Sequence, residues 1–242
     1  MKMRLDKFLT ATATASRSES AKAAKQGRIC INGVPCGNSA QQIDAETDVV
    51  EFDGQIIKYK QFVYIMLNKP QGYVSATEDQ REKTVLELLP EKMRTIGLFP
   101  CGRLDKNTIG LMLLTNNGDL GHKLLSPKYH VTKRYRYTSK FPLSDQDITR
   151  LEQGVSILDG YVTLPASVYP DANRSEGEIE ITEGKYHQIK LMFDAIGNKI
   201  TSLERVTFGP LTKDPSLKSG EWRELSDEEI KALENHCNVK RG

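Results

Sequence analysis

One short segment of the chain places an arginine and a carboxylate two residues apart, at Arg103 and Asp105. Apolar runs at 96–99 and 111–114 flank the segment, so the pattern predicts two short strands joined by a polar loop at a sheet edge. Such a scaffold can aim a carboxylate, which acts as a nucleophile or a base when a nearby cation keeps it ionised. The competing interpretation is an ordinary surface pair of arginine and aspartate.

Composition limits the class of protein. The chain has 242 residues, enough for two modest domains, and 38% of them are hydrophobic. No apolar run approaches the ~18 residues of a membrane helix, and the first residues lack the apolar core of a signal peptide. We therefore expect a cytoplasmic protein that has no membrane segment.

The cysteines, histidines and glycines show no spacing typical of a metal or nucleotide site. The four cysteines are scattered without a CxxC pair, which indicates free thiols in a reducing compartment and neither a disulfide framework nor a zinc site. The four histidines show no metal-binding spacing, and the glycine motifs of P-loop and Rossmann proteins are absent from the sequence. We expect neither a metal nor a cofactor.

Basic side chains are clustered although the net charge is only +2. Residues 1–28 carry seven basic side chains against two acidic ones, and residues 120–144 carry six basic side chains and no acidic one. Local clusters of this kind bind a phosphate backbone whatever the total charge. A solvated helix face is the alternative explanation, which two separate acid-poor clusters make less convincing.

Residues 1–58 have the pattern of a small domain with two helices and several short strands. A capping box that begins at Ser16 predicts a helix over 17–26, after a first short amphipathic helix. An Asn-Gly pair at 32–33 and an Asp-Gly pair at 53–54 predict two tight hairpins.

After a connector at 59–61, we expect residues 62–242 to form a larger domain. The pattern predicts strands at 62–67, 73–76, 131–137 and 178–181, a turn at 68–72, and helices at 84–89, 117–125, 145–153, 187–195 and 227–233. Because strands and helices mix without strict alternation, the expected fold is α+β with a mixed, largely antiparallel sheet and flanking helices.

Three segments of the first domain, at 3–9, 16–22 and 27–33, resemble the alpha-L RNA-binding domain in order and spacing. That domain occurs in a small-subunit ribosomal protein, in bacterial tyrosyl-tRNA synthetases and in several rRNA-modifying enzymes. The resemblance implies that the side chains in contact with RNA include Arg4, Lys7, Arg17, Ser18, Lys22 and Arg28. Cations carried on helices and facing phosphates agree with this implication.

Four segments of the larger domain, at 67–74, 102–119, 133–135 and 183–193, resemble the rRNA pseudouridine synthases of the small-subunit branch. The resemblance implies an isomerase that acts on ribosomal RNA or on a pre-ribosomal small-subunit particle and needs no energy source or redox carrier. The 16S rRNA is the expected substrate, although relatives with the same domain plan act on 23S rRNA. A monomer is the default expectation.

The resemblance also implies roles for individual residues. Asp105 is expected either to attack the nucleotide or to remove a ribose proton, and the sequence leaves both routes open. Lys190 is implied to be the basic partner that keeps Asp105 ionised in a site poor in water. Tyr135 is implied to stack on the flipped base, and Ile189 and Leu191 to form apolar walls beside it.

Two further basic residues are expected to hold the RNA. Arg103 is implied to keep the RNA bound with its target base flipped out, a change that costs a few kcal/mol of unstacking. Lys69 is expected, from its charge alone, to contact the flanking backbone together with the cluster at 123–140. The alternative class is an RNA-binding or ribosome-assembly protein of the same fold without chemistry, and the intact motif residues favour the enzyme.

Overall fold

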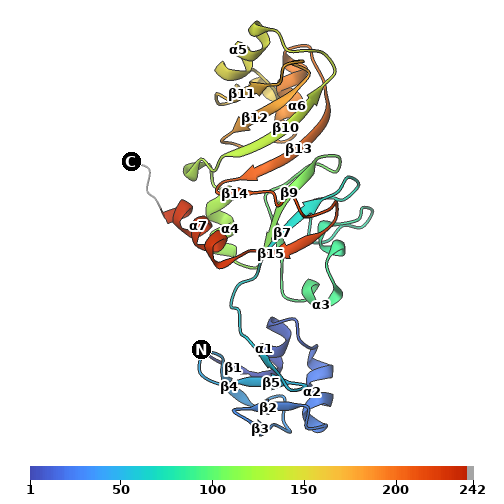
Figure 1. The fold of residues 1–242 in the computed structure, drawn as a ribbon, viewed down its shortest axis with the longest axis vertical. Coiled ribbons are helices and arrows are strands. Elements are labelled where there is room, and N and C mark those ends of the chain that lie inside the picture. The colour runs from blue at the N-terminus through green and yellow to red at the C-terminus, as the bar shows by residue number, and fades with distance from the viewer. Residues whose placement is uncertain (239–242) are drawn as a thin grey trace. The chain divides into compact units, whose positions relative to one another are not determined.

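The computed structural model describes residues 1–238, which form two compact units. The first unit comprises residues 1–63 and 86–99, and the second comprises residues 64–85 and the chain from residue 100 onward. Figure 1 labels the elements of both units. Among the described residues, no helix combines the length and the apolar character that crossing a membrane requires.

The first unit packs its helices against short strands around one core. Its elements are β1 (Lys2–Arg4), α1 (Leu5–Ala11), α2 (Arg17–Lys25), β2 (Ile29–Ile31), β3 (Val34–Pro35), β4 (Gln42–Asp44), β5 (Val50–Phe52), β6 (Gln55–Ile57) and α3 (Glu91–Arg94). Strand β1 pairs with β4, and β3, β2, β5 and β6 form an antiparallel sheet in that order. Leu5, Phe8 and Leu9 of α1 are buried in the same core as Ile29 and Val50.

Local sequence signals of this unit are confirmed. The Ser16 hydroxyl accepts from the Glu19 amide at 3.2 Å, and the Glu19 carboxylate accepts from the Ser16 amide at 2.8 Å, which completes the capping box. Asn32 and Gly33 have φ values of 52° and 78°, the left-handed pair that a type I′ hairpin turn requires.

The second unit is built on one long mixed sheet. Its strands are β7 (Tyr64–Lys69), β8 (Phe99–Cys101), β9 (Ile109–Thr115), β10 (Lys133–Ser139), β11 (Ser167–Pro170), β12 (Glu176–Ile181), β13 (Ile200–Phe208), β14 (Leu211–Thr212) and β15 (Trp222–Glu224). Its helices are α4 (Gly118–Leu125), α5 (Asp145–Gln153), α6 (Gln188–Ala195) and α7 (Asp227–Asn238), with 3₁₀ turns at Pro127–Tyr129 and Leu158–Gly160. A further 3₁₀ turn, Val85–Leu88, has its first residue in the second unit and the rest in the first.

The sheet order explains how distant segments meet. Within residues 1–238 the strands follow the order β11-β12-β10-β13-β9-β7-β15, while β14 pairs with β13 and β8 with β9. Strands β9 and β13 run parallel, and antiparallel pairs make up most of the sheet. The predicted α+β fold is therefore confirmed.

Strand β9 lies at the centre of this unit and is covered on both faces. Leu111 and Leu113 belong to a core that α4 and α7 complete, and these two helices lie beside each other in Figure 1. Met112 and Leu114 are equally buried and point to the opposite face, because successive strand residues alternate. A continuous apolar run is typical of such a central strand.

Two predictions near the start of the larger domain are wrong. The segment 73–76 bends and forms no strand, apart from a bridge at residue 74. The turn predicted over 68–72 begins later, because Asn68 and Lys69 still belong to β7. Pro70 then ends the strand, since proline has no amide proton to donate to the ladder.

Candidate active site

A cleft of about 350 Å³ opens in the second unit. The loop between β8 and β9, strands β10 and β13, and the segment that leads from β12 into α6 all contribute to its walls. These elements are distant in sequence, and the sheet order brings them together.

The loop that carries Asp105 is held by hydrogen bonds on both sides. The Ser75 hydroxyl donates to the Leu104 carbonyl at 2.7 Å and accepts from the Leu104 amide at 3.0 Å. The Gly72 amide donates to the carbonyl of Lys106 at 2.9 Å. The bent segment around residue 75 therefore fixes the backbone on either side of Asp105.

The ammonium group of Lys69 lies fully buried against this loop. Its Nζ donates to the carbonyl oxygens of Pro70, Asp105, Lys106 and Thr108 at 3.1, 3.1, 3.3 and 2.9 Å. Burial lowers the pKa of Lys69 to about 8, and the charge of Asp105 opposes that shift. A contact with the RNA backbone, which the sequence predicted for Lys69, is incompatible with a side chain that exposes no surface. Lys69 instead holds the loop.

Two nitrogen-bearing side chains meet the Asp105 carboxylate. Lys190 Nζ lies 2.5 Å from Oδ2, and His187 Nε2 lies 3.4 Å from Oδ1. The Asp105 side chain keeps 24% of its surface exposed, so the carboxylate is accessible from the cleft. The structure thus brings together two predicted residues that are 85 positions apart, and adds a histidine to which the sequence interpretation gave no role.

The start of α6 determines where these two side chains lie. His187 has a left-handed backbone, with φ 51° and ψ 26°, directly before the helix. Gln188 fixes the preceding turn, because its Oε1 accepts from the Lys185 amide at 2.9 Å and its Nε2 donates to Glu183 at 2.7 Å. Lys190 follows within the first helical turn.

The apolar lining of the cleft differs in part from the prediction. Tyr135 and Ile189 both line the cleft, with 7% and 3% of their surface exposed. Leu191 is not among the lining residues, because side chains two positions apart on a helix point in directions about 200° apart. Ile181 and Leu203, which the sequence did not single out, complete the apolar lining.

A partly buried lysine and a buried arginine also line the cleft. The charged groups of Lys133 and Arg205 lie 5.8 and 4.9 Å from the ring centroid of Phe208. Arg205 is 1% exposed and its Nε donates to the Leu111 carbonyl at 2.8 Å. Burial, together with the charge of Arg205, lowers the pKa of Lys133 to about 8. The sequence gave Arg205 no role, because a single arginine in an alternating strand carries no local signal of burial.

The residues expected to meet RNA are distributed over both units. Arg103 is exposed at the cleft. All six residues of the first unit that the resemblance implied are exposed, namely Arg4, Lys7, Arg17, Ser18, Lys22 and Arg28. Arg4 pairs with Asp6 at 2.6 Å, and Arg28 pairs with Asp53 at 2.5 Å, so part of this charge is neutralised within the protein.

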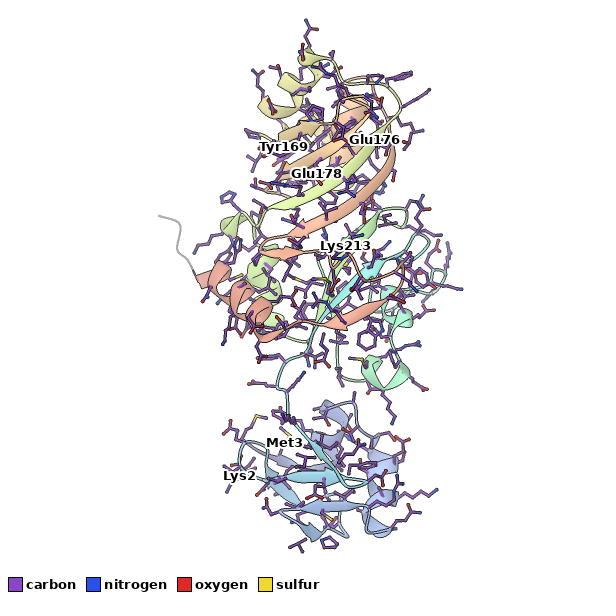
Figure 2. All side chains as sticks on the ribbon, in the orientation of Figure 1. Lys2, Met3, Tyr169, Glu176, Glu178 and Lys213 are labelled. Atoms are coloured by element: carbon purple, nitrogen blue, oxygen red, sulfur yellow. The ribbon has the colours of Figure 1, made fainter. Side chains whose placement is uncertain are left out.

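The basic cluster at 123–140 is also partly neutralised. Arg134 pairs with Glu180 at 3.0 Å, and Arg136 lies 3.5 Å from Glu178. Both glutamates are on the neighbouring strand β12, and Figure 2 labels Glu178. In the part of the chain that the structure describes, no three His, Cys, Asp or Glu side chains gather in a way that could hold a metal ion.

Comparison with known proteins gives a consistent match. Residues 63–195 match the family model of RNA pseudouridylate synthases, and residues 3–50 match that of the S4 domain. The chain is 46% identical over 235 residues to the uncharacterized RNA pseudouridine synthase YtzG of Bacillus subtilis, covering 96% of this chain and 98% of that protein.

Two relatives whose names include the ribosomal small subunit, and one solved structure, give similar matches. The ribosomal small subunit pseudouridine synthase A of Yersinia pestis is 40% identical over 238 residues, with 96% of this chain and 98% of that protein covered. The Escherichia coli protein of the same name is 35% identical over 232 residues, with 96% and 100% covered. A crystal structure of a pseudouridylate synthase, 34% identical, superposes with a TM-score of 0.67 over 96% of this chain and 99% of that one.

Proposed function

The chain belongs to the RNA pseudouridine synthase family and carries an S4 domain, and on this premise we propose that it converts one uridine of 16S ribosomal RNA to pseudouridine. It is therefore an isomerase, and its substrate is RNA. The choice of 16S rRNA is supported by the two relatives named for the ribosomal small subunit. The Bacillus subtilis relative has no substrate in its name.

The observation that carries the proposal is the Asp105 carboxylate in the cleft, 2.5 Å from the Lys190 ammonium. A neighbouring cation favours the ionised form of a carboxylate, which is the form that both a nucleophile and a base require. The cleft volume of about 350 Å³ lies at the small end of ligand pockets and suits one nucleoside. The target uridine must then leave its stack to enter, as base-modifying enzymes require.

The reaction rearranges bonds within one nucleotide. The bond between uracil N1 and ribose C1′ breaks, the base rotates while it is held, and C5 bonds to C1′. The C5 proton is lost and N1 gains a proton, so atoms and charge balance without a co-reactant. Asp105 acts either by attack on the nucleotide or by removal of a ribose proton, and the geometry is compatible with both routes.

Other residues of the cleft hold the base and the RNA. Tyr135 stacks on the flipped uracil, and Ile189 provides an apolar wall beside it. Arg103, exposed at the cleft, holds the RNA while the target base is flipped out. Lys69 acts on the reaction through the loop that it supports, as a positioning residue.

The chain divides this work between two parts. Residues 1–58 bind RNA through the exposed basic side chains of the S4 domain, and residues 62–242 carry the catalytic domain. The protein acts as a monomer on ribosomal RNA or on a pre-ribosomal small-subunit particle. RNA binding of this kind is electrostatic and depends on shape more than on base edges.

Pseudouridine mapping of ribosomal RNA from cells with and without this gene tests the proposal. Carbodiimide forms an adduct on pseudouridine, and this adduct stops reverse transcriptase. One stop in 16S rRNA should therefore disappear when the gene is deleted. Its return with a plasmid copy excludes a secondary mutation. A lost stop in 23S rRNA would contradict the 16S assignment, and unchanged maps of both RNAs would contradict ribosomal RNA as the substrate.

A further inference from the structure

An exposed tyrosine at the cleft has no place in the proposed chemistry. Tyr186 lines the cleft and exposes 65% of its surface, although tyrosine side chains are usually half-buried or more. Its ring stacks face to face on the ring of His187, with centroids 3.9 Å apart and planes 14° apart. The His187 ring therefore covers one face of the Tyr186 ring.

The stack is held in place by the segment around it. His187 is fixed by its left-handed backbone at the start of α6 and by its contact of 3.4 Å with Asp105. The residues before Tyr186 are held as well, because the Gln188 side chain accepts a hydrogen bond from the Lys185 amide and donates one to the Glu183 carboxylate. A preorganised aromatic ring loses little conformational entropy when a ligand stacks on it.

The surroundings of the ring favour a nucleotide over an apolar ligand. Arg103 and Lys185 line the same cleft and are exposed, so two cations lie near any strand that enters. The nearby carboxylate of Glu183 is engaged, because it accepts from the Tyr161 hydroxyl at 2.6 Å and from the Leu164 amide at 2.9 Å. An aromatic face beside cations is the usual platform for an unpaired base.

The size of the cleft indicates which base stacks on Tyr186. A cleft of about 350 Å³ suits one nucleoside, so the neighbouring bases are left to contact the exposed residues of the lining, and Tyr186 is an exposed aromatic side chain among these. When the target leaves its stack, the adjacent base loses a stacking partner. We propose that Tyr186, supported by His187, is the platform on which the base next to the target uridine stacks. This inference rests on the proposed function and adds a specificity-determining contact to it.

A thermodynamic cycle between Tyr186 and the neighbouring nucleotide tests the proposal. The full-length protein is assayed on a short synthetic RNA that carries the uridine mapped in the ribosomal RNA. Versions of this RNA have an abasic site on the 5′ or the 3′ side of that uridine. Tyr186→Ala should lower kcat/KM on the intact RNA by about 5- to 150-fold, the range measured for one base stacked on an aromatic ring. On the RNA that lacks the stacking base, the same substitution should have no further effect.

Matched variants separate stacking from other effects. Tyr186→Phe and Tyr186→Trp keep the aromatic face and should keep kcat/KM within about threefold. Tyr169→Ala removes another exposed tyrosine, which lies on the edge strand β11 (Figure 2). Tyr169 is not among the residues that line the cleft, so this variant should change nothing. Thermal melting checks that each variant is folded.

Two results would overturn the inference. Tyr186→Ala could lower kcat/KM equally on intact and abasic RNA, or the phenylalanine variant could lose as much as the alanine variant. The wild-type protein serves as the separate test of the proposed function. If it fails to modify the intact RNA, the proposed function and this inference fall together, whereas modification without coupling refutes only the role of Tyr186.

Discussion

Replacing Lys69 by methionine tests whether this lysine holds the catalytic loop or contacts RNA. Its ammonium donates to four carbonyl oxygens, and two of these acceptors belong to Asp105 and Thr108. Methionine keeps the length and apolar volume of the stem and removes all donors. We expect kcat to fall at least 10-fold, because small displacements of a catalytic group cost up to about 100-fold in rate.

Affinity for RNA separates the two roles. If Lys69 acts inside the protein, the Kd for RNA and its dependence on salt should be unchanged in Lys69→Met. If Lys69 binds a phosphate, Kd should rise and the slope of log K against log salt should fall by about 0.7 to 0.9. Filter binding at several salt concentrations measures both quantities, and a reduced slope would refute the assignment from the structure.

The stability of the same variant has a defined pH dependence. The pKa of Lys69 is lowered from 10.5 to about 8, which corresponds to about 3 kcal/mol. Between these pH values the unfolded chain holds a proton on Lys69 that the folded protein has released, so the wild type gains stability as the pH rises. Below pH 8 both states are protonated, and Lys69 contributes no pH dependence.

Absolute stability at pH 7 is a poor test, because two effects of similar size oppose each other. Removing the donors leaves a buried carbonyl at Thr108 without its partner, at a cost of about 1–3 kcal/mol. Removing the charge relieves a burial cost of about 3 kcal/mol. The informative quantity is therefore the difference in unfolding free energy between wild type and Lys69→Met, measured in urea from pH 7.5 to 10.

That difference should grow in favour of the wild type by about 1.4 kcal/mol per pH unit above pH 8. Lys106→Met is the matched control, because Lys106 lies on the same loop, is half-exposed and pairs with Glu82 at 2.7 Å. It should change stability by less than about 1 kcal/mol, because an exposed ion pair contributes little. A pH-independent difference for Lys69→Met would refute the reasoning.

Three further substitutions test other parts of the account. Lys190→Met leaves the Asp105 carboxylate without its ammonium partner and should lower kcat about 100- to 1000-fold in the pseudouridine assay, with RNA affinity nearly unchanged. Replacing Arg17 and Lys22 together by glutamine should leave kcat unchanged and reduce the salt slope of RNA binding by about 1.4 to 1.8. Gly110→Ala should destabilise the protein by more than about 2 kcal/mol in urea unfolding, because φ is 100° and a Cβ atom would lie 2.3 Å from the Arg205 carbonyl.

Two of these predictions have a matched control variant, and two have a stated contradicting outcome. Lys190→Arg keeps the charge and should retain more activity than the methionine variant, and full activity of Lys190→Met would refute the ion pair. Gly118→Ala meets no atom within 4 Å and should be tolerated, unlike Gly110→Ala. An unchanged salt slope after loss of both cations would place RNA binding elsewhere on the protein.

The sequence predicted best those features that depend on neighbouring residues. The capping box at Ser16 set the start of α2 correctly, because its two partners are three residues apart. The left-handed turns at 32–33 and 53–54 were equally clear, since few residues adopt that conformation. Tertiary contacts were not needed for any of these assignments.

The candidate site was predictable only where a motif preserved its spacing. Asp105 and Lys190 lie 85 residues apart, and a family resemblance was the signal that linked them. The burial of Lys69 gave no such signal, because three of its four acceptors lie 36 to 39 residues later in the chain. The role that the resemblance implied for Leu191 failed for a simpler reason, since Ile189 and Leu191 are two positions apart on α6 and point in different directions.

The most direct measurement is pseudouridine formation by Asp105→Asn on a 16S rRNA transcript, with RNA binding measured in parallel. Asparagine keeps the size of the side chain and removes its charge, so the loop that Lys69 supports should persist. We predict that the variant binds the transcript with the wild-type Kd and yields no reverse-transcription stop at any uridine. A variant that modifies the RNA at the wild-type rate would contradict the claim that this carboxylate performs the reaction.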